Sequence, residues 1–565
     1  MTEKTGSKLF AEMLHGYGVS HVFYLPAIML GGIAEMEPFG IKRVMTHGEK
    51  SAAYMADGYA RASGKPGVCM AQQIGASNLS AGLRDAYMAC SPVIAITGGP
   101  ALHAHYKHGY QEVEDFSQFE PVTKMNARVD HVSRLPDLMR QAFRTATTGA
   151  PGPVHLQIQG PHGQVANEKT SLPPVVEHQF KSIPPFRSAA EPAHVQAALD
   201  LMAKAQRPII VAGGGVTLSG AQAELVAFAE KIQIPVATSL NAKGAILDTH
   251  PLSVGVVGTY SRECANRAVY EADLVFYIGS HTGGQVTVEW AIPAAHTTVI
   301  QCDIDPEELG RSYPNAASLL GDAKTVLHQL TQSAHVSKHH AAWLDRVYEL
   351  KKAWRDENTP LLTSSAKPIR PERICHEISK ALPQDGVVVS DTGHSGMWTG
   401  AMIDMLHPQQ RFIRCAGSLG WAFPAALGVK CALPDRQVIG FAGDGGFYYH
   451  IAELETAVRY KINLIMVVNN NSSLNQEIPL WDNVFPDKNS SIHQPDELWR
   501  FKPVNFAAIA ESFGCVGIRV EDPDQIQAAL QKAMTLNRPV VIDVVSEEQA
   551  FAKKAWIPKD TKNAH

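Results

Sequence analysis

The sequence predicts an α/β fold with three doubly wound, parallel-sheet domains, and three observations support this prediction. The chain has 565 residues, which is enough for three domains of ordinary size. Short apolar runs alternate with segments of helical periodicity, a pattern typical of parallel strands joined by crossover helices. Polar segments separate three such modules. We therefore expect domains at residues 1–166, 188–335 and 369–550.

The composition narrows the class of protein. With 45% hydrophobic residues, 19% charged residues and no apolar run of membrane-spanning length, we expect a globular protein without a membrane partner. The first nine residues lack the apolar segment of a signal peptide, and the eight cysteines form no CxxC pair. These features predict a reducing, cytoplasmic location. A net charge of −5 without a basic stripe argues against a nucleic acid partner.

The first module contains a strand, near 18–24, and a later junction between a strand and a helix. The segment 44–49 runs into a helix at 51–61, whose small side chains allow close packing on a neighbour. Glu49 lies at this junction, where the helix dipole favours its charged form. On its own, a glutamate there is also typical of an ordinary first helical turn.

The middle module is predicted to contain four strands, near 208–212, 234–237, 274–279 and 299–305. The turn Gly213–Gly214–Gly215 follows the first of them without completing a GxGxxG fingerprint, so a dinucleotide site stays open. A linker rich in proline, serine and charge at 167–192 precedes this module, and a polar connector at about 336–368 follows it.

The third module contains the strongest functional pattern. Asp444 follows an apolar run at 438–442, Asn471 ends a second run at 464–468, and helical periodicity lies between them. Since the carboxyl ends of parallel strands border one crevice, we expect both side chains there, where their oxygens suit Mg²⁺ or Ca²⁺. Gly445 and Gly446 allow backbone N–H groups to approach a phosphate. A bare Gly-Asp-Gly, in contrast, is usually a capped turn.

The spacing of 27 positions between Asp444 and Asn471 resembles the signature of thiamine-diphosphate enzymes. The resemblance implies that these two side chains and the main-chain carbonyl of Ser473 hold Mg²⁺, which in turn binds the diphosphate. Glu49 precedes the run Ala-Asp-Gly-Tyr-Ala-Arg at 56–61, as in the family's pyrimidine-binding helix. By the same resemblance, Glu49 shares a proton with N1′ of the cofactor and so generates the reactive C2 ylid.

The resemblance implies further cofactor contacts. Gly393, His394 and Ser395 follow a predicted strand and are placed to donate hydrogen bonds to the diphosphate. The stretch 415–428 resembles benzoylformate decarboxylase and its relatives. There, the residue matching Leu419 wedges between the two cofactor rings, and the carbonyl matching Gly417 accepts a bond from the 4′-amino group.

Other positions bear on the substrate. Gln111 matches a position facing the thiazolium and substrate, and the loop containing Gln72 and Gln73 keeps the frame, but not all side chains, of acetolactate synthases. Ile28 stands where benzoylformate decarboxylase has a serine, so these four residues predict an uncharged pocket that favours carbon–carbon ligation. His281 replaces an arginine that acetolactate synthases use for flavin or acceptor-acid contacts, which leaves FAD or ADP in the middle domain open.

These observations predict a thiamine-diphosphate- and Mg²⁺-dependent enzyme of the acetolactate synthase-like group. It would cleave a 2-oxo acid next to its carbonyl, as a decarboxylase or carboligase, with sites between subunits of a homodimer or homotetramer. The alternatives are an acyl-CoA lyase or decarboxylase, like oxalyl-CoA decarboxylase or 2-hydroxyacyl-CoA lyase, and a non-catalytic cofactor-binding or regulatory subunit. Three further histidines, at 103, 105 and 108, have a loose spacing typical of solvated loop residues rather than of metal ligands.

Overall fold

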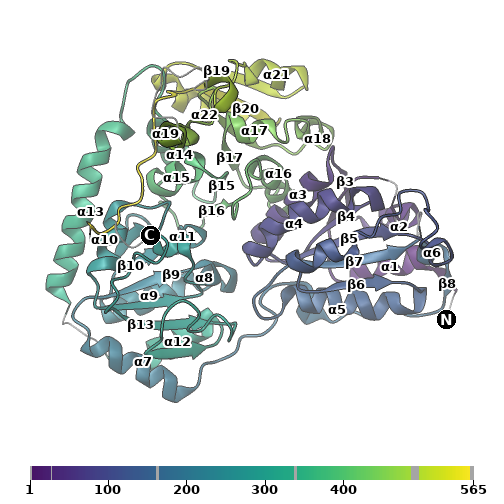
Figure 1. Cartoon of the computed structure of the whole chain (residues 1–565), viewed down its shortest axis with the longest axis horizontal. Coiled ribbons are helices and arrows are strands. Elements are labelled where there is room, and N and C mark those ends of the chain that lie inside the picture. The colour runs from purple at the N-terminus through teal and green to yellow at the C-terminus, as the bar shows by residue number, and fades with distance from the viewer. Residues whose placement is uncertain (1–2, 27, 161–163, 336–339, 485–494, 560–565) are drawn as a thin grey trace.

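The computed structural model describes residues 3–26, 28–160, 164–335, 340–484 and 495–559. The chain forms three α/β domains, each with a six-stranded sheet in which all paired strands are parallel (Figure 1). The predicted fold class is thereby confirmed, while the exact domain limits stay predictions. None of the helices in these ranges combines the length and the apolar character needed to cross a bilayer.

The first domain, on the right in Figure 1, has the strand order β3-β2-β4-β5-β7-β6. Its strands are β2 (His21–Tyr24), β3 (Lys42–Met45), β4 (Gly67–Ala71), β5 (Val93–Gly99), β6 (Asn126–Val129) and β7 (Val154–Gln159). Its helices are α1 (Gly6–Gly16), α2 (Leu30–Glu35), α3 (Glu49–Ser63), α4 (Ala76–Met88), α5 (Leu135–Thr147) and α6 (Gln164–Asn167). A short antiparallel pair, β1 (Lys4–Thr5) with β8 (Lys169–Thr170), joins the two ends of this domain.

The middle domain has the order β11-β10-β9-β12-β13-β14. Its strands are β9 (Pro208–Ala212), β10 (Val236–Thr238), β11 (Ser253–Val256), β12 (Leu274–Ile278), β13 (Thr298–Asp303) and β14 (Ala317–Leu320). Its helices are α7 (Pro192–Lys204), α8 (Gly214–Ser219), α9 (Gln222–Ile232), α10 (Glu263–Glu271), α11 (Gly284–Thr287) and α12 (Ala323–Ser333). The strands are apolar almost throughout because helices cover both faces of the sheet.

The third domain repeats the topology of the first, with the order β16-β15-β17-β18-β20-β19. Its strands are β15 (Val387–Ser390), β16 (Arg411–Arg414), β17 (Val438–Gly443), β18 (Ile465–Asn470), β19 (Val516–Val520) and β20 (Val540–Val545). Its helices are α14 (Pro371–Ala381), α15 (His394–Met402), α16 (Ala422–Ala432), α17 (Asp444–Tyr448), α18 (Glu453–Arg459), α19 (Ile478–Val484), α20 (Pro495–Leu498), α21 (Phe506–Ser512) and α22 (Ile526–Thr535).

The connector predicted at about 336–368 is largely a helix, α13 (Ala341–Leu362), at the left edge of Figure 1. Its apolar residues Trp343, Val347, Leu350 and Trp354 recur every three or four positions and are buried. The sequence therefore carried a helical period that the polar composition of the segment masked. Residues 336–339 lie outside the described ranges.

The first and third domains of one chain are joined by α3 and α16, which lie side by side in Figure 1. A Cβ atom added to Gly58 would lie 2.2 Å from the carbonyl oxygen of Ala425, and one added to Gly428 would lie 1.9 Å from that of Met55. Only glycine allows the two helix backbones to approach so closely. The small residues noted in the sequence thus serve helix packing.

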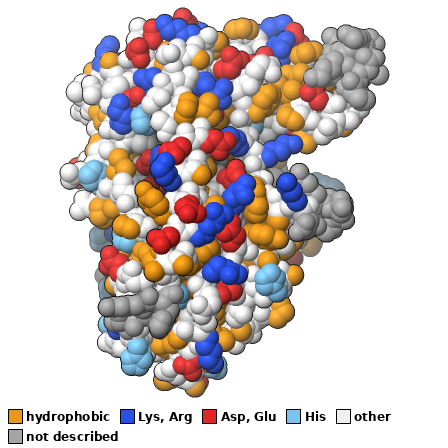
Figure 2. Space-filling model, turned by 90° about the vertical axis from the view of Figure 1, so that its left-hand side faces the viewer, with side chains coloured by type: hydrophobic (Ala, Val, Ile, Leu, Met, Phe, Trp, Pro, Cys, Tyr) orange, Lys and Arg blue, Asp and Glu red, His pale blue; other side chains and the backbone are white. Residues whose placement is uncertain are grey.

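The face that lies on the left in Figure 1 carries a mixed charge distribution. Figure 2 shows lysine and arginine side chains interspersed with aspartate and glutamate over this face, without a broad patch of one sign. Many of these charges are paired, as in the ion pairs of Arg346 with Glu271 and of Arg355 with Asp404. This face therefore offers no extended cationic track for a nucleic acid backbone.

Candidate functional site

The strand order of the third domain creates a crevice at the carboxyl ends of β15 and β17. The sheet is built outward in both directions from this pair, so the connections leave the two strands toward opposite faces. Gly393 and His394 come shortly after β15, while Asp444 directly follows β17. The predicted residues therefore meet at the position where doubly wound folds bind ligands.

A cavity of about 270 Å³ occupies this crevice. It is lined by nine of the residues predicted to contact the cofactor or its metal: Gly393, His394, Ser395, Leu419, Asp444, Gly445, Gly446, Asn471 and Ser473. The tenth from this domain, Gly417, lies outside the cavity lining, two positions before Leu419 in the same loop. The structure thus brings together residues that span 80 positions of the sequence.

Asp444 has an unsatisfied carboxylate oxygen in this cavity. The residue is 2% exposed; its Oδ1 accepts a hydrogen bond from the backbone N–H of Gly445 at 2.8 Å, whereas its buried Oδ2 has no partner. Burial raises the pKa of Asp444 to about 7. The Oδ1 of Asn471 lies in the same wall and accepts from the N–H of Ser473 at 3.1 Å. A hard divalent cation would satisfy the free oxygen and favour the ionised carboxylate, so these residues fit Mg²⁺.

The part of the cavity that follows β15 has the form of a phosphate cradle. Gly393 has a φ of 64°, and a Cβ atom there would lie 2.6 Å from Oε1 of Gln476, so a side chain would be both strained and obstructed. Asn475 donates to two carbonyl groups, and its Oδ1 faces Nδ1 of His394 at 2.8 Å. The proton of a neutral His394 ring must therefore lie on Nδ1. Burial lowers the pKa of His394, which favours the neutral ring without a proton on Nε2. Nε2 therefore donates to an anion only if the negative charge of the anion stabilises the doubly protonated ring.

Leu419 is half-buried at the cavity wall instead of lying in the hydrophobic core, as expected for an apolar side chain that contacts a ligand. Two carboxylates that the sequence analysis missed hold its loop. Asp391 accepts from the N–H groups of Gly420 at 3.0 Å and Ala422 at 2.9 Å. Asp85, from α4 of the first domain, accepts from the N–H groups of residues 416, 417 and 418 at 2.7 to 3.1 Å.

The motif at 56–61 has a structural role in the same region. Arg61 donates to Asp57 at 2.6 Å and to Asp85 at 3.1 Å, and the indole N–H of Trp421 donates to Asp57 at 2.9 Å. The helix that follows Glu49 thus fixes the loop that carries Leu419. Asp391 has a recognisable position, directly after a strand at the crevice, whereas Asp85 lies inside a helix and has no local signal.

Glu49 occupies the first position of α3 and is half-buried. Its Oε2 accepts from Nδ2 of Asn78 at 3.1 Å, and a Cβ atom on Gly75 would lie 2.3 Å from its Oε1. Because Gly75 has no side chain, the carboxyl group of Glu49 can lie close to the backbone of the loop that contains Gly75. Gln72 of the same loop donates to Oε1 of Gln111 at 2.6 Å, so three predicted residues gather on one side of the first domain.

The remaining predicted pocket residues are placed differently. Gln73 is 4% exposed and its Nε2 has no partner, as expected for an amide that awaits a ligand. Ile28 is 2% exposed and packs in the hydrophobic core of the first domain. His281 belongs to another cavity, where its Nε2 lies 3.8 Å from Sγ of Cys90. Within the described ranges, no three His, Cys, Asp or Glu side chains gather as a metal site.

Among the described residues, those of the middle and third domains line the cavity beside Asp444. None of the described residues that line it comes from the first domain, although Glu49 belongs to the same predicted site. Large apolar side chains are exposed on loops around Gln72 and Gln111, with Tyr110 82%, Tyr106 77% and Ile74 57% exposed. Such a surface is typical of one that another protein molecule covers.

Comparisons with known proteins agree with this geometry. Three family models match in chain order: the N-terminal TPP binding domain of thiamine pyrophosphate enzymes at residues 4–119, their central domain at 195–330, and their C-terminal TPP binding domain at 391–544. These matches fall on the three sheets described above.

Several similar proteins are named acetolactate synthase large subunits, one of them as a probable one. A probable acetolactate synthase large subunit of Methanocaldococcus jannaschii is 33% identical over 557 residues, covering 96% of this chain and 91% of the relative. Acetolactate synthase large subunits of Parasynechococcus marenigrum and Lactococcus lactis are 32% and 30% identical, each covering 96% of this chain and 87% and 92% of their own lengths. The chain therefore belongs to the thiamine-diphosphate-dependent enzymes, within the acetolactate synthase-like family.

Proposed function

We propose that this chain is a Mg²⁺-dependent carboligase that cleaves a 2-oxo acid next to its carbonyl and passes the acyl unit to an acceptor carbonyl. The observation that supports this best is the buried Asp444, which lines the cavity at the crevice of the third domain and has a carboxylate oxygen without a hydrogen-bond partner. The names of these relatives support the reaction class, because they denote the synthesis of acetolactate.

The third domain would hold the metal and the diphosphate. Asp444 and Asn471 would bind Mg²⁺ through side-chain oxygens, and Ser473 through its main-chain carbonyl. The backbone N–H groups of Gly393, His394 and Ser395, together with Gly445 and Gly446, would face the phosphate oxygens. With three ligands from the protein, Mg²⁺ would keep its other coordination positions for phosphate oxygens.

Thiamine diphosphate, when bound, supplies the carbanion chemistry. The chain's own contribution is to hold and move protons at defined atoms. The carboxyl group of Glu49 would hold a proton at the pyrimidine N1′, the carbonyl of Gly417 would accept from the 4′-amino group, and Leu419 would fix the conformation of the two rings. The contact with Asn78 and the room left by Gly75 orient the Glu49 carboxyl group for this task.

The predicted pocket residues of the first domain favour ligation over release of a free aldehyde. Gln72, Gln73 and Gln111 present amides, which do not protonate a carbanion as an acid would. An acyl-CoA lyase or decarboxylase remains the alternative reaction. The middle-domain crevice, where β9 and β12 diverge beside Gly213–Gly214–Gly215, is the position for FAD or ADP if either binds.

The complete site would form between two chains, with Glu49 from one and Asp444 from the other. The exposed apolar loops around Gln72 and Gln111 support an interface there, so a homodimer is the smallest active unit and a homotetramer is compatible with it. The cytoplasmic location stays a prediction.

A donor and acceptor screen tests the function. Pyruvate and other 2-oxo acids, and acyl-CoA thioesters, are offered with acceptor acids and aldehydes, and products are identified by mass spectrometry, with Glu49→Gln as the control. We expect a carboligation product from a 2-oxo acid that is absent with the variant. Products from thioesters alone would favour the acyl-CoA alternative, and full activity of Glu49→Gln would refute the proposed role of this residue. A lack of substrate-induced change in the circular dichroism of the bound cofactor would indicate a non-catalytic subunit.

A further inference from the structure

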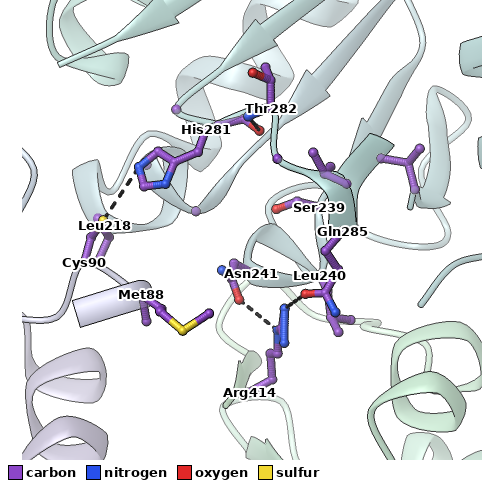
Figure 3. A pocket seen from close by; sticks show the side chains of 18 of the residues that line it. Met88, Cys90, Leu218, Ser239, Leu240, Asn241, His281, Thr282, Gln285 and Arg414 are labelled. Atoms are coloured by element: carbon purple, nitrogen blue, oxygen red, sulfur yellow. Dashed lines mark hydrogen bonds between the residues drawn. The ribbon is translucent and has the colours of Figure 1, made fainter. Parts of the chain in front are cut away.

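A cavity of about 550 Å³ lies between the first and third domains, at the amino ends of their sheets. Its lining includes His21 and Lys42, the first residues of β2 and β3, and the segment 460–463 that leads into β18. The end of α16 contributes Lys430. The cavity beside His281 (Figure 3), in contrast, borders the loops that follow β9 and β12, at the carboxyl ends of these strands. The proposed cofactor site also lies at carboxyl ends, so the cavity between the first and third domains is separate from both.

Hydrogen bonds between the two domains fix the walls of this cavity. The backbone N–H of Met45, at the end of β3, donates to the phenol oxygen of Tyr460 at 2.9 Å. The carbonyl oxygen of Met45 accepts from Nη2 of Arg459 at 3.1 Å. Because β3 is an edge strand of its sheet, these bonds satisfy backbone groups on its open edge. The cavity is thus a fixed space between two docked domains.

The lining of the cavity is rich in positive charge. Its cationic side chains are those of Lys42, Arg43, Lys430 and Lys461. Among the described residues that line it, Glu37 is the one acid, and it lies 2.9 Å from Arg43 and so compensates that guanidinium. The whole protein carries a net charge of −5, so this concentration of positive charge runs against its average.

The three lysines of the lining have no carboxylate bonded to them. Lys430 is half-buried, and its ammonium group donates to the carbonyl oxygen of Arg436 at 2.6 Å. Burial lowers the pKa of Lys430, and Asp435, outside the lining, acts on it from a distance. In the part of the chain that the structure describes, Lys42 and Lys461 bond to no carboxylate. Like charges around one cavity repel, and a bound anion would relieve this repulsion.

His21 adds a buried hydrogen-bond donor to the same lining. The residue is 9% exposed, and burial, together with the charge of Lys42, lowers its pKa to about 4, so the ring is neutral at neutral pH. Its Nδ1 lies 2.9 Å from Oγ of Ser20, and this Oγ lies 2.7 Å from the hydroxyl oxygen of Tyr59.

The direction of these bonds follows from the buried hydroxyl of Tyr59. Tyr59 is 5% exposed, and among the described residues its hydroxyl proton has Ser20 as its acceptor. Tyr59 therefore donates to Ser20, Ser20 donates to Nδ1 of His21, and the proton of the neutral ring lies on Nε2. Nε2 has no hydrogen-bond partner within the described ranges, so its N–H is available to a ligand in the cavity.

We propose that this cavity binds a phosphorylated small molecule, whose phosphate group is held by Lys42, Lys461 and the Nε2–H of His21. Ammonium groups bind phosphate as point charges with three donors each, and several cations around one cavity suit the two negative charges of a phosphate monoester. Burial raises the pKa of Cys431, which also lines the cavity, to about 12, so its thiol is neutral and adds no negative charge. The inference goes beyond the proposed reaction, because it concerns binding at a separate position and needs no turnover.

Calorimetric titration of the holoenzyme with glycerol 3-phosphate and with inorganic phosphate tests the proposal. The double variant Lys42→Gln, Lys461→Gln keeps both side chains polar and removes two charges. We expect at least one probe to bind the wild type and to bind the double variant at least about tenfold more weakly, because charge-assisted hydrogen bonds are lost. His21→Phe keeps a ring but removes the donor, and should weaken binding by about three- to tenfold.

Lys532→Gln is the matched control. Lys532 is an exposed lysine of α22 outside the cavity lining, so its loss changes the net charge but should leave probe affinity unchanged. Binding of neither probe to the wild type, or equal affinity of the wild type and the double variant, would overturn the proposal. An equal weakening by Lys532→Gln would also overturn it, because the effect would then be one of net charge alone. Unchanged affinity in a folded His21→Phe would overturn the role of this ring, and if that variant does not fold, the double variant of exposed lysines decides the outcome.

Discussion

Replacing Gly75 with alanine is expected to displace the carboxyl group of Glu49, for which we propose a catalytic role, without unfolding the protein. The new Cβ atom would lie 2.3 Å from Oε1 of Glu49 and 2.7 Å from its Cδ and Cγ, where contacts under 3.0 Å essentially never occur. The backbone at Gly75 has φ −85° and ψ −2°, which alanine adopts without strain. The flexible side chain of Glu49 must therefore yield, by at least about 0.7 Å.

A misplacement on the order of 1 Å at a reacting centre lowers rates by about 100-fold, so we expect kcat to fall by about 10- to 100-fold. The assay is steady-state consumption of the donor acid identified by the screen, at saturating thiamine diphosphate and Mg²⁺, with the melting temperature measured in parallel. Gly48→Ala is the matched control, because its Cβ atom meets nothing closer than Oγ of Ser51 at 3.8 Å. Unchanged kcat in Gly75→Ala, or an equal loss in Gly48→Ala, would refute the role assigned to this carboxyl group.

Two further predictions follow from the site. Asp85→Asn removes the charge that binds Arg61 and the loop before Leu419; it should cost about 3–5 kcal/mol of stability and weaken cofactor affinity, and an unchanged urea midpoint would contradict this. Treatment with EDTA, or Asp444→Asn, should release thiamine diphosphate on desalting, as thiochrome fluorescence reports; retention after either change would argue against a metal at this position.

The two proposed side-chain ligands of the metal could be singled out in the sequence because each has a local signal. Asp444 and Asn471 end apolar runs, and the spacing between them carries the resemblance that the fold and the comparisons agree with. The three sheets could be predicted for the same reason, since strands buried on both faces leave continuous apolar runs.

The residues that could not be predicted act through contacts distant in sequence. Asp85 lies in the middle of a helix and meets a loop more than 300 positions away. Helix α13 was missed for a different reason, because its polar composition hid a regular apolar period. The sequence of one chain also does not reveal that Glu49 and Asp444 would share a site, because the proposed site takes these residues from two chains.

Co-expression of two inactive variants, Glu49→Gln and Asp444→Asn, tests the central claim most directly. If each site takes Glu49 from one chain and Asp444 from the other, every hybrid dimer has one site with both residues intact. Random pairing then restores about one quarter of wild-type activity, because half of the dimers are hybrids with one of two sites working. Absence of activity in a mixture whose hybrid dimers are demonstrated by mass spectrometry would contradict a site shared between chains.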